Sequence, residues 1–231
     1  TIVEGMASFD EHFLEDSDKV MNKLVDLHRK VNGSKKRNDE GRAYLAGREQ
    51  PGNHEHNQML YYDFFDLPHN ESWYHIRYGM ADFFALNTNV DYRRGSEQLD
   101  WFEAALRESE APWKIVFFHH PPFACAESRM PGTTRVQEHI VPLLEEYGVD
   151  LVLLGHDHLY GRSRSVNGVT YVISGGGGSA LYQPAPNDIM EVCERRYHYL
   201  RLHVDREEIR WVAIDEDGEI IDEYAIPGDS E

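Results

Sequence analysis

The fold of this chain is decided by residues 114–154, which open with Lys-Ile-Val-Phe-Phe (114–118) and close with Asp-Leu-Val-Leu-Leu (150–154). Both runs are short and almost continuously apolar, as strands buried on both faces of a sheet are. A helix capped by Thr133 or Thr134 is predicted between them from its apolar residues: Val136, Ile140, Leu143, Leu144 and Tyr147. Strand, helix and strand in this order predict a parallel βαβ unit.

Histidines follow both predicted strands directly. His119 and His120 come after the first, and Gly-His-Asp-His (155–158) comes after the second. Because ligands gather beyond the carboxyl ends of parallel strands, we expect imidazoles from both strands at one edge of the sheet. Neutral imidazole is a common ligand of zinc, iron, manganese and nickel. The pattern favours a metal site over the plainer alternative, a capping histidine and a solvated turn.

A third motif, Pro-Gly-Asn-His-Glu, occupies residues 51–55. Asn53 offers an amide oxygen as a metal ligand, and His54 offers an imidazole that could act as a general acid near neutral pH. Taken alone, this motif would be interpreted as a polar turn after a proline and a glycine. Its value comes from its order and spacing relative to the two histidine motifs that follow.

The composition is globular and strongly acidic. Among 231 residues, 41 are acidic and 23 basic, which gives a formal net charge of −18. Such a surface repels nucleic-acid backbones, so no nucleic-acid partner is expected. It also repels anionic substrates at long range, so a site for them needs local cations. No segment approaches the ~20 apolar residues of a membrane helix and no signal-like segment opens the sequence, so localisation is left open.

The other elements are predicted from periodicity and turn residues. They are a helix over 9–31, antiparallel strands 73–78 and 82–87 turning at Gly79, a helix capped by Ser96 and running to about Ser109, strands 164–166 and 170–173 joined by Asn-Gly, and a meander of strands 197–204, 209–214 and 220–226.

Three features outside the motifs have plain structural interpretations. Cys125 and Cys193 are too few for a disulfide framework, and one bridge or two free thiols are both open. The glycines at 175–178 are similar to an anion-binding loop, but no helix with a lysine follows, which favours a closely packed turn. His198 is predicted to pack in the core.

Taken together, the three motifs resemble the calcineurin-like metallophosphoesterase superfamily, above all its purple acid phosphatase-like branch. The resemblance also includes the sequences over 116–123, 155–163 and 171–178, and it covers residues 51–226. It implies an α/β fold, a sandwich of two mixed β-sheets flanked by helices. We expect one such domain over residues 1–231, with its N-terminal strands missing.

The resemblance also implies a role for each motif residue. Three residues match ligands of one metal ion: Asn53, His119 and His156. His158 matches a ligand of a second metal, and His120 matches a position that is not a ligand. His54 matches the residue that stabilises the transition state or protonates the leaving oxygen. The implied cofactors are two ions of iron, manganese or zinc, ~3.5–4 Å apart, which neutralise the phosphate and activate water.

Two motifs of that superfamily are not found before residue 51. One is Asp-x-His, and the other is a later Gly-Asp whose carboxylate bridges the metals. Residues 2–5 and 9–13 look like the sequence just after Gly-Asp, so Thr1 is expected at or beside the bridging position of a truncated chain. Residues 10–12 do spell Asp-Glu-His, but no apolar strand precedes them, which favours a solvated helix start.

The predicted function is hydrolysis of phosphate monoesters or diesters, with a small phosphoester as the partner and the oligomeric state left open. Weak or no activity is expected of the chain as given, because two cations repel each other without the bridging carboxylate. The alternative is a non-catalytic relative holding one ion at Asn53, His119 and His156. A zinc hydrolase of another ester fits the Asn-His pair less well. Substrate choice is assigned to loops 125–132 and 182–187.

Overall fold

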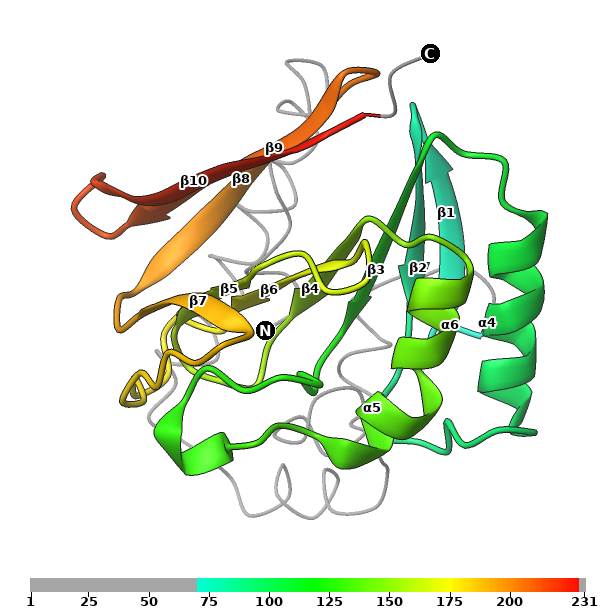
Figure 1. Cartoon of the computed structure of the whole chain (residues 1–231), viewed down its shortest axis with the longest axis horizontal. Coiled ribbons are helices and arrows are strands. Elements are labelled where there is room, and N and C mark those ends of the chain that lie inside the picture. The colour runs from blue at the N-terminus through cyan, green and yellow to red at the C-terminus, as the bar shows by residue number, and fades with distance from the viewer. Residues whose placement is uncertain (1–69, 229–231) are drawn as a thin grey trace, which may run out of the picture.

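A computed structural model describes residues 70–228 of the chain. The helix expected over 9–31 and the motif at 51–55 lie outside the described residues. Two sheets form the described part, with strand orders β1-β2-β3-β4-β6-β5-β7 and β10-β9-β8 (Figure 1). The strands are β1 (Tyr74–Tyr78), β2 (Ala81–Ala85), β3 (Trp113–Phe118), β4 (Leu151–Leu154), β5 (Tyr160–Ser163), β6 (Thr170–Ser174), β7 (Met190–Glu194), β8 (His198–Val204), β9 (Glu208–Asp215) and β10 (Ile220–Pro227).

The centre of the large sheet is parallel. Strand β3 pairs in parallel with β2 and β4, and β4 pairs in parallel with β6. Ile115 and Val116 of β3, like Leu151 and Val152 of β4, are fully buried. The prediction of a parallel βαβ unit with strands covered on both faces is therefore confirmed.

Each face of the large sheet is covered by a different layer. Figure 1 shows helices α4 (Glu97–Glu108), α5 (Thr134–His139) and α6 (Val141–Glu146) on one side, and the three-stranded sheet on the other. One core joins Val116 and Val152 to the helices, and a second joins Ile115 and Leu151 to Trp211 and its neighbours on the small sheet. Adjacent residues of one strand thus pack into opposite cores, which explains why the strand sequences are continuously apolar.

Most elements agree with the sequence-based predictions. The strands β1 and β2 pair antiparallel around Gly79, whose φ is +56°. Ser96 caps α4, its hydroxyl accepting a hydrogen bond from the backbone N–H of Leu99 at 3.3 Å. Asn167 and Gly168 form the predicted turn, both with positive φ. The expected meander is the small sheet, whose neighbouring strands all pair antiparallel.

Some boundaries differ from the predictions. The helix expected after Thr133 is divided into α5 and α6 at Ile140, because Pro142 has no N–H to continue the α-helical ladder. The strand predicted over 164–166 is wrong: β5 ends at Ser163, and in the predicted range Val166 forms an isolated bridge to Val169. Strand β7 was not predicted. None of the described helices has the length and hydropathy to cross a bilayer.

The loop after β3 is fixed to the far edge of the large sheet. Cys125 of this loop forms a disulfide with Cys193, which lies in β7, and their Cα atoms are 5.8 Å apart. Of the two alternatives left open by the sequence, one bridge or two free thiols, the structure has the bridge. Backbone hydrogen bonds add to it, from Glu127 N–H to the Gln183 carbonyl at 3.0 Å and from Ala185 N–H to the Cys125 carbonyl at 2.8 Å. The loops over 125–132 and 182–187 therefore form one tied unit.

Asp157 joins this unit to the loop after β4. Its side chain is fully buried, and Oδ2 accepts the backbone N–H groups of Cys125 at 3.0 Å and Ala126 at 3.2 Å. Burial raises the pKa of this carboxyl, while the two backbone donors act to lower it. The residue between His156 and His158 thus holds their loop against the loop that follows His119.

The glycine segment after β6 is a closely packed turn, as predicted. A Cβ on Gly175 would collide with the Asp157 carbonyl, and one on Gly176 would collide with the ring of His198. His198 is itself buried, with Nδ1 donating to the Arg196 carbonyl at 2.9 Å and Nε2 bonded to the Ser174 hydroxyl at 3.1 Å. The predicted core packing of His198 is confirmed.

Removal of the disulfide should destabilise the protein substantially. The bridge closes a loop with a sequence separation of 68 residues, and the chain-entropy model gives about 4 kcal/mol for such a loop. We expect a Cys125→Ala, Cys193→Ala double variant to lose about 2–4 kcal/mol of unfolding free energy in urea titrations. Wild-type protein kept in dithiothreitol should lose a similar amount. An unchanged midpoint in both would contradict this role.

Loss of the Asp157 carboxylate should destabilise the protein in a graded way. Asp157→Ala leaves two backbone N–H groups buried without their acceptor, and we expect a loss of about 1–3 kcal/mol in unfolding free energy. Asp157→Asn keeps one acceptor oxygen and should lose less. Urea denaturation compares the two variants, and an alanine variant as stable as wild type would show that the contact contributes nothing.

Candidate functional site

The pairing of β3 with β4 sets two histidines side by side. Phe118 pairs with Leu154, and the next N–H along β4, from Gly155, donates to the carbonyl of His119 at 3.2 Å. Nε2 of His119 then lies 3.1 Å from Nδ1 of His156. Imidazoles from two strand ends meet at one edge of the sheet, as the sequence predicts.

His120 completes a cluster of three imidazoles. One nitrogen from each of His119, His120 and His156 lies within 4.8 Å of the others. The hydroxyl of Thr88, in the loop after β2, lies 2.9 Å from Nδ1 of His120 and accepts the backbone N–H of His120 at 3.3 Å. The ring orientation of His120 is therefore set by a third strand end, a contact that the sequence did not predict.

The electrostatic environment favours a neutral His120. Burial lowers its pKa to about 4, and the nearby guanidinium of Arg129 acts in the same direction. At neutral pH the ring is uncharged, which is the form of imidazole that binds a metal ion. The resemblance gives His120 no ligand role, whereas the geometry brings it into the cluster.

The turn that presents His156 is unusual in its backbone. His156 has a φ of +66°, a left-handed conformation that residues with a Cβ adopt rarely. Gly155, the residue before it, packs closely against the histidine of the neighbouring strand end, since an added Cβ would lie 3.4 Å from Nδ1 of His119. Strained residues of this kind cluster at functional sites, where the surrounding structure holds them.

His158 lies outside the three-histidine cluster found among residues 70–228. Its Nδ1 is 3.0 Å from the carbonyl of Ala180, and its ring stacks on Tyr182 with centroids 4.4 Å apart. Because a carbonyl only accepts, Nδ1 carries the proton and the lone pair of the neutral ring is on Nε2. A backbone carbonyl orienting the far nitrogen in this way is typical of metal-binding histidines.

The donor set fits a transition-metal ion. Two nitrogens bound 2.0–2.1 Å from one ion lie about 2.9–3.4 Å apart in octahedral or tetrahedral geometry, and the nitrogens of His119 and His156 are separated by 3.1 Å. Two neutral imidazoles at that distance otherwise share a proton, since two facing lone pairs repel. Imidazole nitrogen suits zinc, iron and manganese alike.

Arg129 supplies a positive charge close to this cluster, and sequence patterns did not indicate it. Its Nη2 donates to the hydroxyl of Tyr182 at 2.9 Å, and its guanidinium carbon lies 5.2 Å from the centre of that ring. The same charge acts on the pKa values of His120 and Asp157. The two tied loops thereby hold a guanidinium near the histidines.

The described residues contain three of the five predicted site residues. His119 and His156 are brought together, His158 lies on the neighbouring Tyr182, and Asn53 and His54 lie outside the described residues. Thr88, Arg129 and Asp157 were missed, because each acts through contacts with residues distant in sequence. An acidic residue between two histidines at a buried strand end was the one local signal that pointed to Asp157.

Comparison with known proteins is consistent with the purple acid phosphatase-like branch. The chain is 32% identical over 124 residues to purple acid phosphatase 3 of Arabidopsis thaliana, a match covering 52% of this chain and 33% of that protein. It is 28% identical over 134 residues to the probable inactive purple acid phosphatase 1 of the same plant, covering 47% and 22%. The chain thus spans about a third or less of these relatives.

A solved structure has the same fold. Purple acid phosphatase PPD1 from yellow lupin (Lupinus luteus) seeds superposes with a TM-score of 0.67 at 23% identity, covering 78% of this chain and 39% of that one. The described α/β architecture of two sheets and flanking helices is therefore the metallophosphoesterase fold. The family model for calcineurin-like phosphoesterases matches residues 44–160, about half of the chain, and the chain belongs to that family.

Proposed function

We propose that this chain contributes the site of a metal-dependent phosphoesterase that hydrolyses phosphate monoesters or diesters through two metal ions and an activated water. The observation that carries the proposal is the 3.1 Å contact between His119 and His156 at the parallel strand ends. Family membership supports the general class, phosphoester hydrolysis. The substrates and metals of the whole protein are part of the proposal.

In this proposal His119, His156 and Asn53 hold one ion, and His158 holds the other. The tautomer of His158, set by the Ala180 carbonyl at 3.0 Å, supports its use of Nε2. When bound, the two cations would neutralise the phosphate and activate the attacking water. His54 would donate a proton to the leaving oxygen, as general acids of suitable pKa do.

Arg129 would orient the phosphate. A guanidinium presents a rigid fork of N–H donors that matches phosphate oxygens. The hydroxyl of Tyr182 accepts one of these donors at 2.9 Å, which fixes the fork while leaving most of it to bind an anion. A fixed cation of this kind also offsets the net charge of −18 that opposes the approach of an anion.

A non-catalytic relative with a single ion is the second candidate. One observation favours it, because His158 is not among the clustered donors of the described residues. The resemblance of the sequence to a probable inactive purple acid phosphatase is compatible with it. In that case the cluster would serve structure or binding, and the number of bound metals separates the two candidates.

Metal content tests the ligand set directly. The purified chain, loaded with manganese or zinc and then dialysed, is expected to retain metal by mass spectrometry. His156→Ala should lose most of it, because one of two adjacent donors is gone. His203→Ala is the matched control, since that exposed histidine pairs with Asp205 at 3.0 Å, apart from the cluster. Equal metal in both variants would refute the assignment.

Turnover tests the reaction. We expect a metal-loaded protein, extended at its N-terminus by an added Asp-x-His and Gly-Asp segment, to hydrolyse p-nitrophenyl phosphate or its bis ester. His54→Ala should lower kcat by about 10²–10⁴, the usual contribution of a general acid. Two metals with full turnover in His54→Ala would remove His54 from the mechanism. One metal without turnover would favour the single-ion candidate.

A further inference from the structure

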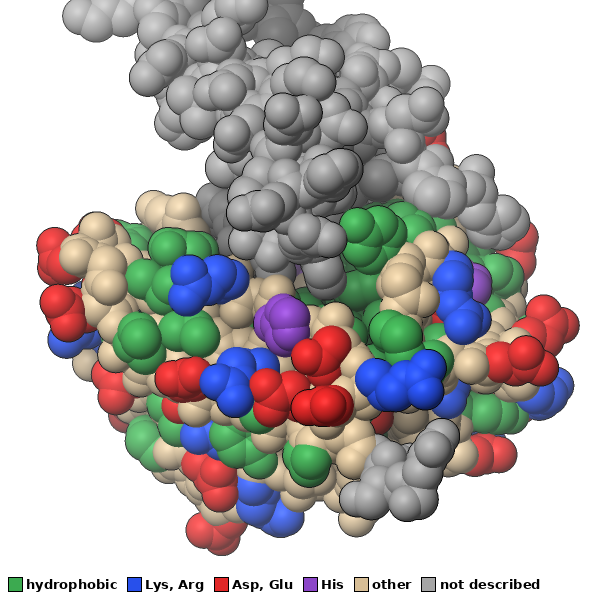
Figure 2. All heavy atoms as spheres, turned by 90° about the horizontal axis from the view of Figure 1, so that it is seen from above, with side chains coloured by type: hydrophobic (Ala, Val, Ile, Leu, Met, Phe, Trp, Pro, Cys, Tyr) green, Lys and Arg blue, Asp and Glu red, His purple; other side chains and the backbone are tan. Residues whose placement is uncertain are grey.

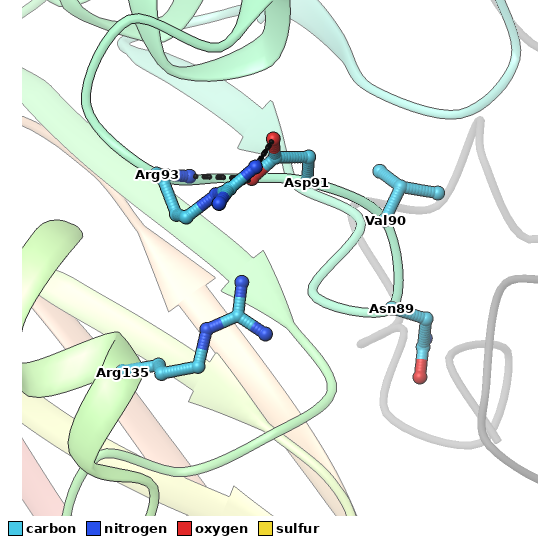
Figure 3. A pocket seen from close by; sticks show the side chains of 5 residues that line it. All are labelled: Asn89, Val90, Asp91, Arg93 and Arg135. Atoms are coloured by element: carbon cyan, nitrogen blue, oxygen red, sulfur yellow. Dashed lines mark hydrogen bonds and ion pairs between the residues drawn. The ribbon is translucent and has the colours of Figure 1, made fainter.

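A second concave site lies beside the histidine cluster, and the proposed reaction does not use it. It is an open pocket of about 550 Å³ lined by Asn89, Val90, Asp91, Arg93 and Arg135 (Figure 3). The first four residues belong to the loop between β2 and α4, and Arg135 lies in α5. Figure 3 shows the guanidinium of Arg135 directed towards the Asp91–Arg93 pair.

One arginine of the pocket is held by a carboxylate. Nε and Nη2 of Arg93 donate to the two oxygens of Asp91 at 2.9 and 2.7 Å, and the backbone N–H of Arg93 donates to Oδ1 at 3.1 Å. This bidentate pairing fixes the plane of the guanidinium and uses two of its five N–H donors. The remaining donors of Arg93 are left for another acceptor.

The other arginine is held by an aromatic ring. The guanidinium carbon of Arg135 lies 4.9 Å from the ring centre of Tyr92, a buried side chain between Asp91 and Arg93. Across residues 70–228, this stacking, rather than an ion pair within 4 Å, positions Arg135. A stacked guanidinium keeps its in-plane donors available for an oxyanion.

The walls of the pocket are connected to the histidine loop. Thr88, which contacts His120 at 2.9 Å, immediately precedes the pocket residue Asn89. On the opposite wall, Thr133 lies two residues before Arg135. Its backbone N–H donates to the Pro121 carbonyl at 2.9 Å, in the loop that follows His120. The pocket therefore begins one residue from the side chain that contacts His120 of the cluster.

The charge of the pocket is opposite to that of the chain. Two guanidinium groups and one carboxylate give it a net charge of +1, whereas the whole chain carries −18. On the face shown in Figure 2, acidic and basic side chains are interspersed. Two arginines around one cavity thus form a local anion-attracting site on an acidic molecule.

We propose that this pocket binds a second phosphate group of the substrate, so that the preferred substrates are phosphoesters whose alcohol part carries another phosphate. The proposal rests on the proposed function for its catalytic part, while the binding itself needs only Arg93 and Arg135. The two rigid forks match the oxygens of a phosphate, and the Asp91 carboxylate, which would repel a free anion, is already satisfied by Arg93.

Binding of inorganic phosphate to metal-free protein tests the pocket without any turnover. Calorimetric titration at pH 8 and low salt compares wild type with Arg135→Ala, Arg135→Lys and Arg94→Ala. Arg94 is the matched control, an exposed arginine of the same loop that does not line the pocket. We expect Arg135→Ala to weaken binding about tenfold or more, Arg135→Lys less, and Arg94→Ala hardly at all.

Three results would overturn the proposal. They are no measurable binding by wild type, equal weakening by Arg135→Ala and Arg94→Ala, and loss of binding in His156→Ala, which would move the phosphate to the histidines. In metal-loaded protein to which an Asp-x-His and Gly-Asp segment has been added, Arg135→Ala should raise KM for an aryl phosphate bearing a second phosphate, and leave KM for p-nitrophenyl phosphate unchanged. Phosphate binding without any turnover in that extended protein would refute the proposed function and leave the pocket intact.

Discussion

The parallel pairing of β3 with β4 is the constraint on which the candidate site depends. The register that sets Phe118 beside Leu154 also sets His119 beside Gly155. Nδ1 of His156 then lies 3.1 Å from Nε2 of His119. Both strands are buried on two faces, so a slip by one residue would move each side chain into the opposite core and disrupt the packing of both. The hydrophobic energy that fixes this register is therefore the same energy that holds the two imidazoles together.

Around this pair, contacts between loops determine which way the donors face. Asp157 connects the β4 loop to Cys125, the disulfide connects Cys125 to β7, and Tyr182 connects Arg129 to His158. These loops come from separate parts of the chain, and each is anchored by a buried or covalent contact. Such anchoring stabilises the left-handed backbone of His156, and it places positive charge near the cluster of an otherwise acidic protein.

The sequence predicted the elements whose signals are local. Continuous apolar runs identified β3 and β4, Ser96 identified the start of α4, and Asn167 with its glycine identified a turn. The division of the helix at Ile140 was missed, although Pro142 was visible, because the apolar spacing continues through it. Thr88, Arg129 and Asp157 could not be found in this way, since their partners are 31 to 53 residues away in sequence. The disulfide was one of two open alternatives for the same reason.

Anomalous diffraction from crystals of the metal-loaded protein tests the central claim most directly. With data collected at the absorption edge of the loaded metal, the account predicts a peak within bonding distance of Nε2 of His119 and Nδ1 of His156, at about 2.0–2.1 Å for zinc. A second peak at Nε2 of His158 would support the two-metal form. A fully loaded crystal with its metal elsewhere, and with the two imidazoles still sharing a proton, would contradict the account.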